Sequence, residues 1–146
     1  MLRRLCVFCG SSPGIQPSYA RAADDMGSLL AGRGIDLVYG GGNVGLMGRV
    51  ADAFVAMPGG YDTWEEFCEV LTWSQLGLQR KACAVLNVSG YYDPLLDMAD
   101  RAVDQGFLRD AHRELLLADT DPSRLLERLT SYTVPIVDKW IDRAAR

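Results

Sequence analysis

Three short segments of the chain are rich in glycine, and each could hold a phosphate group. They are CGSSPG at 9–14, GGGNVG at 40–45 and PGGYDT at 58–63. Glycine leaves the backbone amides open to an anion, because it has no side chain and adopts positive φ at little cost. One such segment alone could equally be a tight turn between a strand and a helix. Three of them in a chain of 146 residues favour a phosphate-binding site.

The middle segment matches a dinucleotide-binding pattern only in part. Gly40, Gly42 and Gly45 satisfy the spacing G-x-G-x-x-G. That pattern also needs an acidic residue about twenty positions later, at the end of the next strand, to bind ribose hydroxyls. Here the end of the next strand is the Pro-Gly-Gly run at 58–60. A second anion-binding segment in this place favours a mononucleotide, and a nicotinamide-dependent reductase is the weaker alternative.

The elements that must position these segments alternate between strand and helix. Short apolar runs predict strands at 5–10, 36–40, 54–60, 82–90 and 114–119. Apolar residues at helical spacing predict helices at 18–34, 44–53, 63–77, 93–106 and 121–129, and a further helix is expected after residue 135. This alternation predicts a Rossmann-like open parallel sheet with helices on both faces, in a single domain over 1–146. Ligands bind such sheets beyond the carboxyl ends of the strands, where the glycine segments lie.

Charge and hydropathy exclude several kinds of partner. Fifteen Lys and Arg against nineteen Asp and Glu leave a net charge of -4, so we expect no nucleic acid as a partner. No apolar run is long enough to cross a bilayer, which takes about 18 residues or more. The short run after Arg3 and Arg4 is also smaller than the apolar part of a secretion signal. We therefore expect a cytoplasmic protein with no membrane partner.

The four cysteines are expected to be reduced thiols, mostly in the core. Cys6 and Cys9 have the C-x-x-C spacing, as do many redox pairs, but here both fall within one predicted strand. Residues three apart in a strand point to opposite faces, so this pair is not predicted to form a disulfide. Cys68 and Cys83 also lie in apolar runs.

Neither a metal nor an organic cofactor is expected. His112 is the only histidine, so zinc sites that need several histidines have too few ligands. Lys81 and Lys139 are the only lysines, and neither lies in a recognisable site for a pyridoxal Schiff base.

The glycine segments and their surroundings resemble the LOG (Lonely Guy) family, the cytokinin riboside 5'-monophosphate phosphoribohydrolases, some of which carried the older label lysine decarboxylase. The similarity runs from Cys6 to about Leu129 and rests on the motifs G-G-G-x-x-G-L-M-G at 40–48 and P-G-G-x-G-T-x-x-E at 58–66. The resemblance implies hydrolysis of the N-glycosidic bond of cytokinin riboside 5'-monophosphate or AMP to free base and ribose 5-phosphate. It also implies a homodimer, because TWSQLGLQRK at 72–81 resembles the family's dimer-contact segment.

The same resemblance implies the site residues. Glu66 would be the catalytic carboxylate, which suits a reaction that passes through an oxocarbenium-like state and needs an activated water. The residues expected to bind the phosphoribosyl group are Ser11, Ser12, Gly41, Gly42, Gly45, Gly59, Gly60 and Thr63. A structural alternative stays open for two of these residues. Thr63 could be the N-cap of a helix, with Glu66 reaching back to close a capping box.

Two departures from the family pattern bear on activity. Asp62 stands where the family motif has glycine, and two like charges 4 Å apart repel by about 4 kcal/mol at an effective dielectric near 20. The family's M-H-x-R-K stretch, which supplies a catalytic arginine, is absent. It belongs between the predicted helix at 44–53 and the strand at 54–60, where the chain has no Gly, Pro or Asn turn signal.

We therefore expect residues to be missing near 51–54, through a genuine deletion or through a segment absent from the numbering. A genuine loss of the arginine would remove hydrolysis. The alternative function is then a non-catalytic nucleotide-binding or sensing protein.

Overall fold

A computed structural model describes residues 1–39, 50–133 and 135 of the chain, and the fold below is that of these residues. They form one parallel sheet in the order β2-β1-β3-β4-β5. The strands are β1 (Arg4–Phe8), β2 (Asp36–Val38), β3 (Ala53–Ala56), β4 (Ala82–Leu86) and β5 (Leu116–Asp119). Each predicted strand is present, and the predicted α/β class with a parallel sheet is confirmed.

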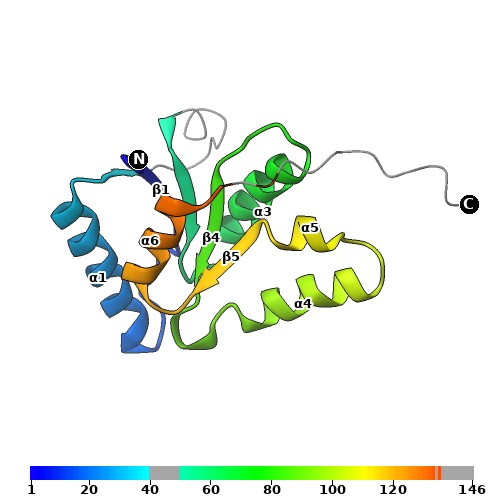
Figure 1. Cartoon of the computed structure of the whole chain (residues 1–146). Helices are drawn as coiled ribbons and strands as arrows, with labels where there is room; N and C mark the ends of the chain where they lie inside the picture. Colours follow the sequence, from blue (N-terminus) through cyan, green and yellow to red (C-terminus); the bar gives the residue numbers. More distant parts are fainter. Residues whose placement is uncertain (40–49, 134, 136–146) are drawn as a thin grey trace, which may run out of the picture.

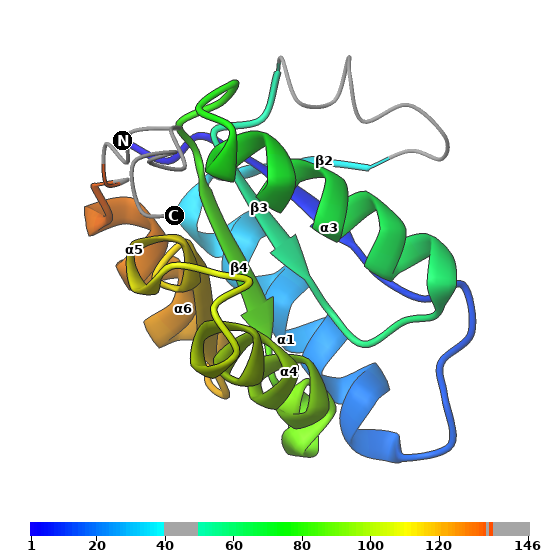
Figure 2. The ribbon, with the colours of Figure 1, turned by 90° about the vertical axis from the view of Figure 1, so that its right-hand side faces the viewer.

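Helices cover both faces of the sheet (Figure 1). One face carries α1 (Pro17–Arg33) and α6 (Pro122–Ser131), and the other carries α3 (Tyr61–Gln75) and α4 (Asp93–Asp104). Figure 2 looks onto the face covered by α3 and α4, with α1 behind the sheet. The short helices η1 (Val88–Gly90) and α5 (Asp110–Arg113) were not predicted from the sequence.

Two predicted helices fall wholly or partly outside the described residues. The helix expected after residue 135 lies outside them. Of the helix predicted at 44–53, only the end is described, and there the prediction is wrong, because Ala53 is the first residue of β3. Val50 is the last helical residue before that strand, so Ala51 and Asp52 alone form the connection.

The alternation of side chains along β1 shows how the core is divided. Leu5 and Val7 pack on the face of α1 and α6, whereas Cys6 and Phe8 pack on the face of α3 and α4. All four have 8% or less of their surface exposed. A parallel sheet buried on both faces requires apolar residues at successive positions, which explains the unbroken apolar runs in the sequence.

Strand register brings two of the glycine segments to the same edge of the sheet. Phe8 at the end of β1 pairs with Ala56 at the end of β3. The segments at 9–14 and 58–63 therefore leave neighbouring strands at the same level. Gly34 ends α1 in a left-handed conformation with φ 63°. Its place after an apolar helical pattern predicted this end.

Hydrogen bonds to Asp52 anchor the start of β3. Its carboxylate accepts the backbone N–H groups of Arg3 and Arg4, each at 2.9 Å. Burial alone would raise the pKa of this carboxyl, but the two backbone hydrogen bonds lower it below its usual value. The ionised side chain therefore holds the first residues of β1 beside the entry to β3.

The cysteines are all free thiols, as expected, but they do not all lie in the core. Cys6 and Cys83 are buried, whereas Cys9 and Cys68 are exposed. The prediction that the cysteines lie in the core is therefore wrong for Cys9 and Cys68. Cys9 lies just beyond the end of β1, where the chain leaves the sheet. No helix in the described part of the chain is long and apolar enough to span a bilayer.

Candidate nucleotide-binding site

The loops that follow β1 and β3 are joined directly. The backbone N–H of Gly10 donates to the carbonyl oxygen of Pro58 at 3.0 Å, and the N–H of Met57 donates to the carbonyl of Phe8 at 2.8 Å. A cavity of about 350 Å³ lies between the two loops. Its lining comes from both loops and from the helices that flank them: Gly10, Ser11, Ser12, Pro13, Gly14, Tyr19, Pro58, Gly59, Gly60, Asp62 and Tyr91. Four predicted binding residues, Ser11, Ser12, Gly59 and Gly60, are thus brought together.

Gly59 is the point of closest approach between the loops. A Cβ atom added there would lie 2.2 Å from Thr63 Oγ1 and 2.7 Å from the backbone nitrogen of Gly10. Both distances are far below van der Waals contact, so any larger residue would push the two loops apart. The glycine at this position is therefore required by packing, whatever it binds.

The first turn of α3 begins at the wall of the same cavity, which Gly60 and Asp62 line. The helix begins at Tyr61 after Gly60, which is the N-cap residue and makes no side-chain capping bond. The first amides of a helix have no partner within the helix, and together with the helix dipole they attract an anion. The structural alternative, in which Thr63 caps the helix and Glu66 closes a capping box, is wrong, because Thr63 lies inside the helix and not at its N-cap.

Thr63 contributes a buried hydroxyl beneath the loop. The residue is 1% exposed. In the described part of the chain, its Oγ1 is a buried atom with no hydrogen-bond partner. A buried hydroxyl without a partner is uncommon in folded proteins. The predicted contact between Thr63 and a substrate stays a prediction, since this oxygen lies under Gly59 and not on the open wall of the cavity.

Glu66 lies one turn further along α3 and is half-buried. Burial raises the pKa of Cys6 to about 12, and the negative charge of Glu66 adds to that rise. Burial also raises the pKa of Cys9, with further contributions from Asp62 and then Glu66. The half-buried carboxylate of Glu66 is therefore within electrostatic reach of the loop that follows β1. Its catalytic role stays a prediction.

Asp62 brings a negative charge to the cavity wall. Its side chain is exposed and lines the cavity, and the residue lies in the first turn of α3. The sequence predicts a negative charge in a phosphate-binding loop, and in the structure this charge lies at the cavity wall. An anion bound there would be repelled by Asp62 while being attracted by the amides of α3.

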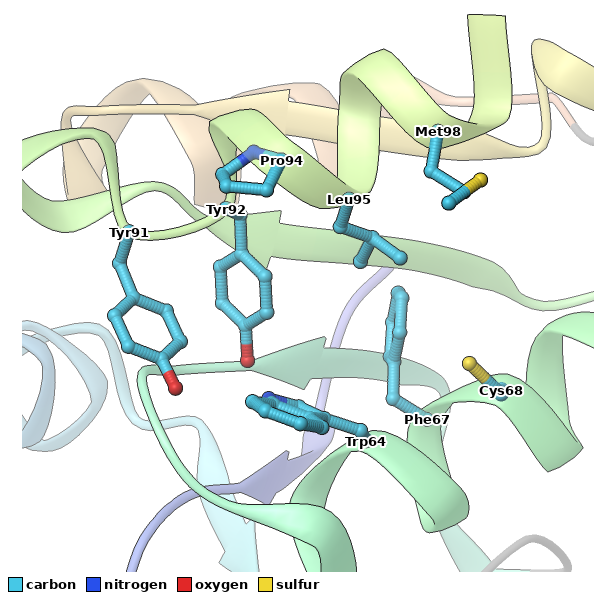
Figure 3. A pocket seen from close by; sticks show the side chains of 8 residues that line it. All are labelled: Trp64, Phe67, Cys68, Tyr91, Tyr92, Pro94, Leu95 and Met98. Atoms are coloured by element: carbon cyan, nitrogen blue, oxygen red, sulfur yellow. The ribbon is translucent and has the colours of Figure 1, made fainter. Parts of the chain in front are cut away.

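Two tyrosines that follow η1 support the Pro-Gly-Gly loop, and the sequence did not reveal this. The hydroxyl of Tyr92 donates to the carbonyl oxygen of Met57 at 2.7 Å, and that of Tyr91 donates to the carbonyl oxygen of Gly59. Figure 3 shows both rings extending from the start of α4 toward the chain that follows β3. The sequence shows two tyrosines after a strand, whose hydroxyls can donate hydrogen bonds. It does not show which carbonyl oxygens accept those bonds.

A second cavity, of about 400 Å³, lies between α3 and α4 (Figure 3). It is lined by apolar and aromatic side chains: Trp64, Phe67, Cys68, Tyr91, Tyr92, Pro94, Leu95 and Met98. Tyr91 lines both cavities. Trp64 and Glu66 are two residues apart, about 200° around the helix, so this apolar cavity lies on the opposite flank of α3 from Glu66.

Comparison with known proteins decides the family. A family model described as "Possible lysine decarboxylase" matches residues 44–129. The phosphoribohydrolase LOG7 of Arabidopsis thaliana, named for cytokinin riboside 5'-monophosphate, is 39% identical over 178 positions, which cover 89% of this chain and 82% of that protein. The chain belongs to the LOG family.

Other members of the LOG family show the same level of similarity. LOG2 of Arabidopsis thaliana is 38% identical over 189 positions, covering 97% of this chain and 88% of that protein. The probable phosphoribohydrolase LOGL5 of Oryza sativa subsp. japonica is 40% identical over 181 positions, covering 91% of this chain and 74% of that protein. Both carry the same substrate, cytokinin riboside 5'-monophosphate, in their names.

These alignments are longer than the chain itself. LOG7 aligns over 178 positions, whereas 89% of 146 residues is about 130, so about 48 positions of this LOG protein have no counterpart here. LOG2 aligns over 189 positions, whereas 97% of 146 residues is about 142, so about 47 positions of LOG2 have no counterpart here. The constant difference supports the expectation that residues are missing relative to the family. Their place near 51–54 stays a prediction.

Some residues of the LOG motifs lie outside the described part of the chain. Gly41, Gly42 and Gly45, predicted to bind the phosphoribosyl group, are among them, so their contribution to the cavity stays a prediction. No group of three or more His, Cys, Asp or Glu among the described residues could hold a metal ion.

Proposed function

We propose that this protein hydrolyses the N-glycosidic bond of cytokinin riboside 5'-monophosphate or AMP, releasing the free base and ribose 5-phosphate. The observation that carries the proposal is the meeting of the 9–14 and 58–63 segments in one cavity, at the start of the helix that bears Glu66. The membership of the LOG family supports the same reaction, because its curated relatives are named for this substrate.

The residues present could divide the work as follows. The amides of the first turn of α3, with Ser11 and Ser12, would bind the 5'-phosphate at the cavity. Glu66 would stabilise the positive charge that develops on the ribose as the bond to the base breaks. The same carboxylate would take a proton from the attacking water, so that a hydroxyl group is added at the anomeric carbon. The departing base would take a proton from solvent, and Glu66 would return the proton of the attacking water to solvent, so that one water molecule is divided between sugar and base.

A non-catalytic nucleotide-binding or sensing protein is the second candidate. Two observations favour it. About 48 positions of the relatives have no counterpart in the chain, and the M-H-x-R-K stretch is absent from its sequence. In addition, Asp62 places a negative charge where the phosphate would bind. A sensor would bind the nucleotide and leave its glycosidic bond intact.

Incubation with AMP and with isopentenyladenosine 5'-monophosphate tests the proposal. Release of free base is followed by chromatography, and nucleotide binding is measured separately by calorimetry. We expect base release by the unaltered protein, and a loss of about 100-fold or more in Glu66→Gln with little change in affinity. Glu65→Gln is the matched control, because the neighbouring carboxylate points about 100° away around the helix.

Each result separates the candidates. Nucleotide binding without base release favours the sensor and rejects the hydrolase. Full turnover in Glu66→Gln rejects the assigned role of that residue but leaves the reaction in place. Absence of both binding and release rejects both candidates.

The proposal extends to a homodimer and a cytoplasmic location. Leu76 and Leu78 of the predicted contact segment are 38% and 66% exposed, and Trp73 beside them is partly buried. Burying such apolar side chains against a second copy would be favourable. Sedimentation should show a dimer, and Leu78→Glu should shift it toward monomer. The four free cysteines agree with a reducing compartment.

A further inference from the structure

The geometry points to Tyr91 and Tyr92 as positioning residues that hold the Pro-Gly-Gly loop in its binding-competent orientation. The two hydroxyls donate to carbonyl oxygens on either side of Pro58: Tyr92 to Met57 at 2.7 Å and Tyr91 to Gly59. Both tyrosines come from the segment after β4, more than 30 residues away from the loop in sequence. The functional part of this inference rests on the proposed nucleotide substrate.

The hydrogen bond from Tyr91 orients an amide of the loop because a peptide unit is planar. The bond from Tyr92 is to the carbonyl that precedes Pro58, which has no N–H, so it fixes the start of the loop and not an amide direction. In a trans peptide the C=O and the following N–H point in opposite directions, and the described chain contains no cis peptide. Holding the carbonyl of Gly59 by Tyr91 therefore sets the direction of the Gly60 N–H. In the same way, the bond from Gly10 to the carbonyl of Pro58 sets the direction of the Gly59 N–H.

A diglycine needs such external support. Glycine has the widest conformational freedom of any residue, and two in succession would sample many orientations. A phosphate-binding loop works best when its amides are oriented before the anion arrives, because ordering the loop on binding costs affinity. The tyrosine hydroxyls supply this order from outside the loop.

The tyrosines are themselves held by the end of β4. The side-chain oxygen of Asn87 accepts the backbone N–H of Tyr92 at 2.7 Å, and its Nδ2 donates to Asp93 Oδ1 at 2.7 Å. Tyr91 packs edge-on against Tyr92 and against Tyr19 of α1, with ring centroids 5.1 Å and 5.8 Å apart. The support for the loop is therefore anchored in the sheet and in a neighbouring helix.

Burial makes the Tyr92 contact difficult to replace. Tyr92 is only 3% exposed, so water has little access to its hydroxyl or to the carbonyl that it binds. Removing the hydroxyl would leave that carbonyl without its donor in a buried place. Tyr91 is less buried, and its ring also forms part of the wall of the cavity.

The test compares three tyrosine-to-phenylalanine variants of the full chain. Tyr91→Phe and Tyr92→Phe each remove a hydroxyl that binds the loop. Tyr132→Phe is the matched control, because Tyr132 also donates to a backbone carbonyl, that of Glu114 at 2.9 Å, but away from the cavity. We measure the affinity for AMP, the kinetic constants for base release, the melting temperature and the hydrogen exchange of the amides at 59–63.

We expect the affinity for AMP to fall about tenfold in each site variant and less than twofold in the control. The amides at 59–63 should exchange at least several-fold faster in Tyr92→Phe, whereas in Tyr132→Phe they should not change. KM for the nucleotide should rise more than kcat falls, since the chemistry at Glu66 is not touched. A general loss of stability would instead lower the melting temperature and speed exchange along the whole chain, not only at 59–63.

Unchanged exchange at 59–63 in both site variants overturns the inference, and so does a loss of affinity in Tyr132→Phe equal to theirs. The exchange measurement needs no substrate. If the unaltered protein neither binds AMP nor releases base, the proposed function fails, while the exchange rates still decide whether the tyrosines order the loop.

Discussion

The backbone N–H of Gly10 donates a hydrogen bond of 3.0 Å to the carbonyl oxygen of Pro58. This bond joins two loops that are 48 residues apart in the chain and leave adjacent strands. It holds them close enough that Gly59 fits only as glycine. The cavity between the loops depends on this contact, and the following predictions test its parts and its surroundings.

Replacing Gly59 by alanine should separate the two loops. The added Cβ would lie 2.7 Å from the Gly10 nitrogen and 2.2 Å from Thr63 Oγ1, so the backbone must move. We expect a loss of about 1–3 kcal/mol in the free energy of unfolding, measured in urea, as for other overpacked sites. The affinity for the nucleotide should also fall, because the two loops that form the cavity are pushed apart.

Gly27→Ala is the control for the alanine substitution. Gly27 lies inside α1, and an added Cβ meets nothing within 4 Å. Alanine is favoured over glycine in a helix, so this variant should gain up to about 1 kcal/mol. Equal effects of the two substitutions would show that the contact between the loops is not tight.

Removing the charge of Asp62 should strengthen the binding of nucleotide phosphate. The carboxylate is exposed at the cavity, so solvent screens its repulsion to about 1 kcal/mol at 4 Å. Asp62→Asn and Asp62→Gly should both bind AMP about fivefold more tightly in calorimetry at low salt. The gain should shrink at high salt, since exposed charges are screened. An unchanged affinity in both variants would place the phosphate elsewhere.

His112 should make the protein less stable in mild acid. Burial lowers the pKa of this side chain below its usual value of 6.5, and the charge of Arg109 contributes. Below pH 6.5 the unfolded chain therefore binds the proton first, and stability falls until the pH reaches the lowered pKa of the folded state.

His112→Gln should reduce this pH dependence. Since the chain has only one histidine, urea unfolding at pH 7.5 and pH 5.5 isolates its contribution. The unaltered protein should lose more stability over this interval than His112→Gln does. Parallel losses in the two proteins would contradict the assignment.

Asp52→Ala should destabilise the entry to β3. The variant leaves the backbone amides of Arg3 and Arg4 without their 2.9 Å partner, which should cost about 1–2 kcal/mol at pH 7. The folded pKa of Asp52 is lowered, so the contribution is present above the usual value of 3.8 and is lost as the pH falls below it. The difference between the two proteins in denaturant unfolding should therefore narrow below pH 3.8. A difference independent of pH would show that the charge is not involved.

Much of the fold could be predicted because local spacing carries it. Strands buried on both faces appear in the sequence as apolar runs, and Leu5, Val7, Cys6 and Phe8 illustrate this, since every position in β1 after Arg4 is buried. Helix periodicity and the glycine that ends α1 located α1, α3, α4 and α6 to within two residues at each end, whereas the short helices η1 and α5 were missed. Family motifs located the expected site residues, although not how they contact each other.

Local spacing could not decide the roles of residues whose partners lie far away. Thr63 and Glu66 have the spacing of a capping box, but α3 begins earlier, at Tyr61, with Gly60 as its N-cap residue. Cys9 and Cys68 lie in apolar runs yet are exposed, because burial depends on which element packs over a residue.

The amino-acid sequence by itself determined the alternating elements, the parallel sheet and the edge at which the glycine segments at 9–14 and 58–63 meet, since these follow from short-range periodicity and chain direction. Only the tertiary structure decided that Gly10 binds Pro58, that two tyrosines hold the Pro-Gly-Gly loop and that Asp62 faces the cavity. Such contacts join residues on different strands and helices. They depend on strand register and helix packing, which are properties of the whole folded chain.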